Sequence, residues 1–318
     1  MNRDAFACPR WHAATEQDFF LLWLRSRHMN SVIIPQDTSL YQFLEPLAEH
    51  KRMLFLAGLP GVGKSLLVNQ LASIAQRHRR RVHLLQWDVC RQPFETDRAV
   101  QEAYPEINGV THGMIRKAVG IWARKTIGKW AMDYAGSEHL LIGELSMVGN
   151  RLIELARKED DRAEALLSSD GTHFITPVPT REVRRMIEGT RAKRSADPQH
   201  QREQADAVPE VMRALWEELY RVAHTFGVID RVPQRNSIAY DPDVYGGVFS
   251  ALLKHRNHEV LSIDVHLSTD GLSVYDLDID QHELIPTAQD VADCIAEVGC
   301  RYPTQAALDQ EMARWYVV

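Results

Sequence analysis

An octapeptide with the pattern G-x-x-x-x-G-K-S constrains this chain more than any other feature of its sequence. It runs from Gly58 to Ser65 and follows the apolar segment 53–57. A helical pattern opens at Leu66, so the octapeptide joins an expected buried strand to an expected helix. Glycines in such a turn let backbone N–H groups curl around phosphate oxygens, which side chains would obstruct. The pattern therefore predicts a phosphate-binding loop at a helix N-terminus, where the helix dipole adds partial positive charge.

Two side chains of this loop have expected roles in nucleotide binding. The Lys64 ammonium can reach the β- and γ-phosphates of a nucleoside triphosphate, and the Ser65 hydroxyl can ligate Mg²⁺. The expected cofactors are ATP and Mg²⁺, and GTP is less favoured because the chain has no Asn-Lys-x-Asp box. The residues expected to hold the nucleotide are Gly58, Pro60, Gly61, Val62, Gly63, Lys64, Ser65 and Leu66.

The composition of the 318 residues is that of an ordinary globular protein, with 45% hydrophobic and 25% charged residues. A net charge of −6 gives no overall attraction to nucleic acid or to acidic membranes. Cys8, Cys90, Cys294 and Cys300 form no C-x-x-C pair, which argues against a zinc site or a disulfide framework. The early apolar stretch 19–24 is too short to span a bilayer, and no signal-peptide pattern occurs. We therefore expect a cytoplasmic protein without a membrane partner.

The order of the expected elements indicates an α/β fold. A strand at 53–57, a helix at 64–79 and a strand at 82–87 follow one another. This order predicts a parallel sheet with right-handed crossovers. A helix over 111–134 and a strand at 139–143 continue the alternation. We expect a three-layer α/β/α arrangement with a mainly parallel sheet.

The chain divides into three expected segments. Residues 1–50 form a helical N-terminal lead-in, with apolar helical patterns at 17–28 and 39–49. Residues 51–204 form a nucleotide-binding core, and residues 205–318 form an α+β C-terminal extension that completes or enlarges this core.

Further elements are expected after the third strand. A charged amphipathic helix is predicted over 150–167, and a short strand over 173–176 that prolines terminate. A β-hairpin is predicted from strands at 259–267 and 272–279, because an Asp-Gly pair stands between them. Other helices are expected over 208–225, 243–255 and 287–298, the last with a capping box from Thr287 and Asp290.

Two polar residues follow the second strand. The strand ends at Asp88, and Arg91 comes three residues later. A carboxylate at the carboxyl end of a parallel strand lies at the ligand-binding edge of the sheet, near the phosphate loop. There Asp88 can orient an attacking hydroxyl or accept its proton, and Arg91 can bind an anionic part of the acceptor. The alternative is a turn-capping aspartate beside a surface arginine.

The third strand also ends at a carboxylate, Glu144. A carboxylate at this place can hold the hydration shell of Mg²⁺ or orient a water molecule. The candidate Mg²⁺ ligands are therefore Ser65, Asp88 and Glu144. The acidic residue usual in a Walker B strand is aspartate, and position 143 is glycine. This departure leaves open whether Glu144 supports transfer to an acceptor or hydrolysis by water.

These motifs resemble those of the P-loop kinases that phosphorylate small molecules and nucleic-acid ends. Shikimate, gluconate and adenylylsulfate kinases belong to that group, as do polynucleotide 5′-kinases and zeta-type toxins. The resemblance covers roughly residues 51–200 and rests on the phosphate loop, on segment 88–91 and on segment 174–194. It implies a P-loop NTPase fold in which Asp88 contacts the acceptor hydroxyl and Arg91 binds the acceptor.

The exit of the fourth strand, 176–185, resembles the entry to a kinase lid. Arg184 and Arg191 flank the buried stripe of the helix that follows, and they are the preferred candidates for contact with the γ-phosphate. An arginine there would stabilise the charge that develops during transfer. The alternative is a solvated, salt-bridged helix face. In such kinases the loop and helix after the second strand bind the acceptor, and the matching candidates are Arg98, Thr111, His112 and Arg116.

The favoured function is transfer of the γ-phosphoryl group of ATP to a hydroxyl of a small anionic or nucleoside-like acceptor. The candidate catalytic residues are Lys64, Asp88, Arg91, Arg184, Arg191 and Glu144. A regulatory ATPase is the first alternative, in which residues 1–50 or 205–318 hold a protein partner. A polynucleotide 5′-kinase is a narrower one, and nucleic acid is not the favoured partner.

Overall fold

The computed structural model describes residues 32–107, 109–196, 209–234, 238–268, 279–280 and 283–318. In this part of the chain a five-stranded sheet has the strand order β2-β3-β1-β4-β5, and all neighbouring strands are parallel. The strands are β1 (Met53–Ala57), β2 (Arg81–Gln86), β3 (His139–Leu145), β4 (Thr172–Pro179) and β5 (His258–Ile263). The prediction of an α/β fold with a mainly parallel sheet is confirmed.

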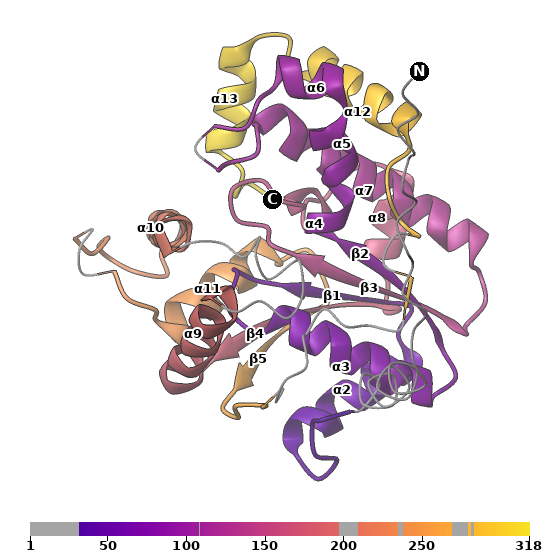
Figure 1. Cartoon of the computed structure of the whole chain (residues 1–318), viewed down its shortest axis with the longest axis vertical. Coiled ribbons are helices and arrows are strands. Elements are labelled where there is room, and N and C mark those ends of the chain that lie inside the picture. The colour runs from indigo at the N-terminus through magenta and orange to yellow at the C-terminus, as the bar shows by residue number, and fades with distance from the viewer. Residues whose placement is uncertain (1–31, 108, 197–208, 235–237, 269–278, 281–282) are drawn as a thin grey trace, which may run out of the picture.

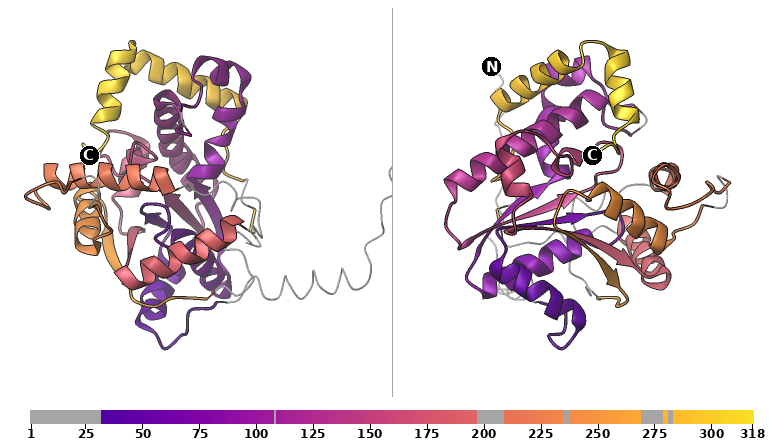
Figure 2. Two further views of the ribbon diagram at one scale, coloured as in Figure 1. Left: turned by 60° about the vertical axis from the view of Figure 1, so that its left-hand side comes forward. Right: turned by 180° about the vertical axis from the view of Figure 1, so that it is seen from behind.

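Helices cover both faces of the sheet, which gives three layers (Figure 1). Helices α2 (Ser39–His50) and α3 (Lys64–Arg77) lie on one face, and α7 (Gly113–Asp133) with α12 (Ala288–Arg301) lies on the other. The right-hand view of Figure 2 shows the same two helical layers from behind. The other described helices are α4 (Trp87–Cys90), α5 (Gln92–Thr96), α6 (Arg98–Ala103), α8 (Arg162–Leu167), α9 (Arg181–Ala196), α10 (Pro209–Thr225), α11 (Pro242–Leu252) and α13 (Gln305–Ala313), with a 3₁₀ turn at Ile153–Leu155.

Alternating residues of the strands build a core on each face. In β1, Leu54 and Leu56 join the core under α2 and α3, whereas Met53 and Phe55 join the core that includes α7. Successive side chains of a strand point to opposite faces. Because both faces are covered, β1 is apolar and buried along its whole length, as expected of a central parallel strand.

The predicted helix over 150–167 is wrong. The chain instead forms a loop over 146–152, a 3₁₀ turn and then the short helix α8. Met147, Asn150 and Leu152 have φ values of 58°, 67° and 65°, which lie outside the right-handed helical region. All three residues are fully buried, so tertiary packing imposes this conformation.

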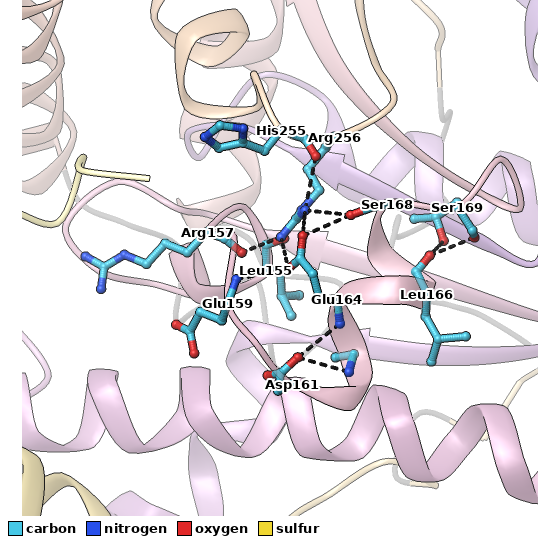
Figure 3. Close-up of polar contacts among 12 residues, drawn as sticks. Leu155, Arg157, Glu159, Asp161, Glu164, Leu166, Ser168, Ser169, His255 and Arg256 are labelled. Atoms are coloured by element: carbon cyan, nitrogen blue, oxygen red, sulfur yellow. Dashed lines mark hydrogen bonds and ion pairs between the residues drawn. The ribbon is translucent and has the colours of Figure 1, made fainter.

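A buried arginine from the C-terminal third fixes the path of the same segment (Figure 3). Arg256 Nε donates to the carbonyl oxygen of Leu155 at 2.8 Å, and Nη2 donates to that of Arg157. Its Nη1 donates to Glu164 Oε1 at 2.8 Å. A continuous helix would use these carbonyl groups internally. Helix α8 begins only where the Asp161 carboxylate accepts hydrogen bonds from its first turn.

Strand β4 is longer than predicted, because it continues through two prolines to Pro179. Beyond Ile175 it no longer pairs with β1 and bonds only to β5. A proline is tolerated where one side of a strand has no ladder to donate to. Strand β5 pairs in parallel with β4 and is an edge strand of the described sheet. The turn and most of the second predicted hairpin strand, 269–278, lie outside the described residues.

Several predicted helices are confirmed with small shifts of their ends. The segments predicted as helices at 39–49, 208–225 and 243–255 correspond to α2, α10 and α11. Helix α12 has the predicted capping box, in which Thr287 and Asp290 satisfy each other's backbone N–H groups. The helix predicted at 17–28 lies outside the described residues. None of the described helices combines the length and the apolar character needed to cross a membrane.

Candidate functional site

The glycine-rich loop leaves the carboxyl end of β1 and enters α3. Gly61 and Gly63 have φ values of 77° and 90°, a region that other residues rarely adopt. Gly63 is the N-cap residue of α3, and no side chain caps this helix. An uncapped helix N-terminus can take an anion in place of a cap. The loop therefore has the backbone form expected of a phosphate-binding turn.

The loop also lies where the sheet changes its winding direction. From β1 the chain runs through α3 to β2, which is one edge strand of the described sheet. From β4 it runs through α9, α10 and α11 to β5, which is the other edge strand. The connections therefore diverge between the carboxyl ends of β1 and β4. In open parallel sheets this divergence forms the crevice in which ligands bind.

Three side chains meet behind the loop, two from the carboxyl ends of the neighbouring strands β2 and β3 and one from the first turn of α3. The Ser65 hydroxyl donates to Glu144 Oε1 at 2.9 Å. The Gln86 amide donates to Glu144 Oε2 at 3.3 Å. The register explains the meeting, because Gln86 is the partner of Glu144 across β2 and β3. The structure thus brings together two of the predicted Mg²⁺ ligands, and it adds Gln86, which the sequence reasoning missed.

These residues fit Mg²⁺ only in company with a nucleotide. Hydroxyl and carboxylate oxygens are the hard ligands that Mg²⁺ prefers, and protein sites commonly supply one or two while phosphates and water supply the rest. In the ranges that the structure describes, no group of three or more histidine, cysteine, aspartate or glutamate residues could hold a metal ion. Ser65 and Glu144 therefore fit a nucleotide-bound Mg²⁺ and do not fit a metal held by protein alone.

Lys64 is buried, with 5% of its surface exposed, at the start of α3. Its ammonium donates to the carbonyl oxygen of Leu59 at 2.9 Å, inside the curl of the loop. An ammonium held in this way has lost most of its water and lies beside the turn that would receive phosphate oxygens.

Asp88 lies apart from these groups. It belongs to α4, one short helix beyond the end of β2, and its side chain is 74% exposed. It accepts a hydrogen bond from Arg91 Nε at 3.2 Å. Asp88 thus follows the second strand, as predicted. Its carboxylate bonds to Arg91 and does not join the Ser65–Glu144 pair.

Arg91 is held by acidic neighbours. Its Nη1 forms an ion pair with Glu95 at 2.6 Å, and Thr111 lies 3.5 Å away. Burial acts to lower the pKa of Arg91, but Glu95 and Asp88 outweigh it and the pKa is raised. Arg98, another predicted acceptor contact, is 91% exposed and pairs with Glu102.

Arg184 connects α9 to the loop. Its side chain is 2% exposed, and its Nη1 donates to the Pro60 carbonyl oxygen at 3.3 Å. Its Nε pairs with Glu188 at 2.7 Å. The guanidinium group also lies over the rings of Trp216 and Tyr240, at 5.5 Å and 5.4 Å from their centres. Arg191 is on the same helix, and its side chain lies outside what the structure describes.

A tyrosine from α11 supports the loop from behind. The Leu59 N–H donates to the Tyr245 hydroxyl at 3.2 Å. A β-carbon at Gly58 would overlap this hydroxyl oxygen. Burial raises the pKa of Tyr245, so the hydroxyl stays protonated. No local pattern in the sequence could reveal this contact, because the two residues are far apart in the chain.

Comparison of the chain with known protein families, with curated proteins and with solved structures found no match. The geometry of the loop and of the side chains around it therefore carries the functional assignment.

Proposed function

We propose that this protein transfers the γ-phosphoryl group of ATP to a hydroxyl of a small anionic acceptor, with Mg²⁺ as cofactor. The observation that carries the proposal is the 2.9 Å hydrogen bond between Ser65 and Glu144, directly behind the Gly61–Gly63 turn. It unites a hydroxyl and a carboxylate at the N-terminus of α3, where a triphosphate bound to the loop would bring Mg²⁺.

The loop and Lys64 would bind the phosphates. Backbone N–H groups of the turn and of the first turn of α3 are the natural donors to the phosphate oxygens. The Lys64 ammonium would exchange its neutral partner, the Leu59 carbonyl, for a charged phosphate oxygen. Hydrogen bonds between two ionised groups are roughly twice as strong as neutral ones, which favours this exchange.

Mg²⁺ would be held by Ser65, with Glu144 orienting a water of its shell. When bound, Mg²⁺ supplies charge neutralisation of the β- and γ-phosphate oxygens. Arg184 would contribute the remaining positive charge from the side of α9. Because this guanidinium is buried, its interaction with a developing negative charge is weakly screened by water.

Asp88 and Arg91 are the proposed acceptor groups. The exposed Asp88 carboxylate can take the proton of an incoming hydroxyl, as a general base must. Its present partner Arg91 would orient it and contact the acceptor.

Hydrolysis is a second candidate function, and Gln86 favours it. A carboxylate and an amide side by side can hold a water molecule for attack, and Glu144 and Gln86 are 3.3 Å apart next to Ser65. In that case the protein would be an ATPase that switches a partner.

A comparison of variants tests nucleotide use and separates the two functions. Calorimetry measures binding of MgATP to wild type, to Lys64→Ala and to the control Lys125→Ala, whose side chain is 54% exposed. We expect Lys64→Ala to weaken binding about 100-fold, because a charged hydrogen bond is lost, and the control to bind normally. If wild type binds neither ATP nor GTP, both candidate functions are rejected.

ADP release is then measured with a panel of hydroxyl compounds and oligonucleotides. Release that depends on an acceptor and falls about 100-fold or more in Asp88→Asn supports transfer. Release that ignores every acceptor and is lost in Glu144→Gln supports hydrolysis. The exposed Asp133→Asn serves as the control for Asp88→Asn and is expected to behave as wild type.

A further inference from the structure

Two arginines meet at the loop that follows β3. Arg116 comes from α7, and its Nη1 donates to the carbonyl oxygen of Gly149. Arg151 lies near the end of the loop over 146–152, and its Nη1 donates to the carbonyl oxygen of Val148 at 2.8 Å. A β-carbon at Gly149 would lie 2.8 Å from a nitrogen of Arg151 and 3.4 Å from a nitrogen of Arg116. The two guanidinium groups therefore converge on one glycine.

These two charges are not neutralised in the part of the chain that the structure describes, where no carboxylate lies within ion-pair distance of either. Glu218 is near Arg116, but its oxygens accept from Trp315 and Arg221. Asp88 is near Arg151, but it pairs with Arg91. The hydrogen bonds that the two arginines make are to neutral carbonyl groups, so an excess of positive charge remains.

The excess charge is also partly desolvated. Arg116 Nε is buried, and among the described residues it has no hydrogen-bond partner. Burial and the charge of Arg151 lower the pKa of Arg116 to about 10. Burial and the charge of Arg91 likewise lower the pKa of Arg151. Buried like charges cost free energy, and a bound anion would remove this cost.

The loop is held rigidly at the edge of the sheet that carries the phosphate loop. Residues 147 and 151 exchange two backbone hydrogen bonds, of 2.7 Å and 3.1 Å. Three of its residues, Met147, Asn150 and Leu152, have positive φ, which residues other than glycine adopt uncommonly. The strand end just before it is tied to the phosphate loop, since the Gly58 N–H donates to the Leu145 carbonyl at 2.9 Å. Strain of this kind gathers at functional sites.

We propose that Arg116 and Arg151 bind the phosphate group of an acceptor that is itself a phosphate monoester. This inference rests on the proposed function, and it specifies the acceptor. A phosphate monoester carries close to two negative charges near neutral pH, which matches two unpaired guanidinium groups. A single carboxylate would leave one of them uncompensated. The planar donors of arginine suit phosphate oxygens in particular.

In the resulting reaction this phosphate serves to bind the acceptor and takes no part in bond formation or cleavage. A free hydroxyl of the acceptor forms the new bond from its oxygen to the γ-phosphorus of ATP. The bond between the γ-phosphorus and the oxygen bridging to the β-phosphorus breaks, and ADP leaves with that electron pair. The hydroxyl proton passes to the Asp88 carboxylate. The product is a compound with two phosphate groups.

The test uses the full chain with its phosphate loop already filled. The protein is saturated with Mg²⁺ and the non-hydrolysable ATP analogue AMP-PNP, and inorganic phosphate or acetate is then titrated by calorimetry. We expect wild type to bind phosphate and to prefer it to acetate by at least tenfold. Arg116→Gln and Arg151→Gln should each weaken phosphate binding at least tenfold, whereas Arg301→Gln, on α12 with 46% of its side chain exposed, should not change it.

The variant Arg151→Lys and thermal melting show whether a loss of phosphate binding comes from unfolding. The lysine keeps the charge and loses the planar donors, so we expect an intermediate phosphate affinity at a near-normal melting temperature. AMP-PNP affinity should be the same in all variants.

Two results would overturn the inference while leaving the proposed function intact. One is bound AMP-PNP with phosphate affinity that is absent, or equal in wild type and the arginine variants. The other is acetate binding as strong as phosphate binding. If AMP-PNP does not bind but phosphate binding still depends on both arginines, the proposed function fails and the anion site stands.

Discussion

Gly58 and Gly63 both belong to the glycine-rich motif, but different forces require them. Gly63 has a φ of 90°, so a side chain there would strain the backbone, although the nearest atom would lie 3.9 Å from its β-carbon. Gly58 is crowded instead, because the Tyr245 hydroxyl occupies the place that a β-carbon would need. The two glycines of one motif are therefore required for different reasons, Gly63 by its backbone conformation and Gly58 by packing.

The residue-scale prediction concerns this packing. Gly58→Ala should lower the free energy of unfolding by about 1–3 kcal/mol, because Tyr245 must move from a well-packed core. Tyr245→Phe in the same chain should recover part of that loss, since it removes the overlapping oxygen. Urea unfolding of the single and double variants measures both effects.

Gly299→Ala is the matched control for the same substitution. Gly299 is in the interior of α12, and a β-carbon there would meet no atom within 4 Å. Alanine is the better helix former, so this variant should be more stable than wild type by about 0.5–1 kcal/mol. A Gly58→Ala protein as stable as wild type would refute the packing argument.

At the scale of elements, α9 links the glycine-rich loop to the C-terminal third. Arg184 reaches the Pro60 carbonyl in one direction and the rings of Trp216 and Tyr240 in the other. Trp216 is on α10, so the position of α9 depends on an element outside the predicted core of 51–204.

The prediction for this element is kinetic. Arg184→Gln should lower the rate of ADP formation about 100-fold, because the proposed mechanism places this buried charge near the transferring phosphoryl group. The ATP affinity should change far less, since the loop and Lys64 remain. Arg185→Gln, an exposed neighbour on the same helix, should have the wild-type rate. Equal rates in the two variants would remove Arg184 from the proposed mechanism.

The elements that the sequence predicts well are those set by local pattern. The apolar run 53–57 and the glycine-rich turn after it carry their own signals, and the parallel order of the strands brings Ser65 and Glu144 to one edge of the sheet. The helix predicted over 150–167 fails for a non-local reason, because Arg256 takes carbonyl groups that a helix would need. Tyr245 and Arg151 were missed likewise, since their roles depend on contacts between distant segments.

At the scale of the whole molecule, an ionic junction joins α7 and α8 to the turn before β5, and Figure 3 shows the part of it between Glu164 and Arg256. Glu164 accepts from Arg256 at 2.8 Å and from Arg124 at 3.0 Å. Burial acts to raise the pKa of Glu164, but hydrogen bonds from Arg256, the Glu159 N–H and Arg124 outweigh it and lower the pKa to about 2. The folded state therefore favours the ionised carboxylate.

This junction predicts a defined pH dependence. A carboxyl group whose pKa is lowered on folding stabilises the fold above its ordinary pKa of 4.5, and this stabilisation is lost as the pH falls towards 2. Glu164→Gln should thus cost about 3 kcal/mol at pH 7 and clearly less at pH 3. Urea unfolding at the two pH values measures the difference.

Glu102→Gln provides the comparison, because Glu102 is 66% exposed and pairs with the exposed Arg98. Its effect should stay below about 1 kcal/mol at either pH, as for other surface ion pairs. A cost of Glu164→Gln that is the same at pH 7 and pH 3 would contradict the assignment.

The hydrogen bonds of Arg256 to Leu155 and Glu164 also have a consequence for the order of events during translation. These bonds join residues that are 101 and 92 positions apart in the chain. Every proposed catalytic residue leaves the ribosome before Arg256 does. The nascent polypeptide therefore contains all of these residues before Arg256 can stabilise the fold that positions them. A fragment that stops near residue 204 would therefore possess each of these groups and lack both Arg256 and strand β5, and the apolar surface that it leaves exposed would make it prone to aggregation.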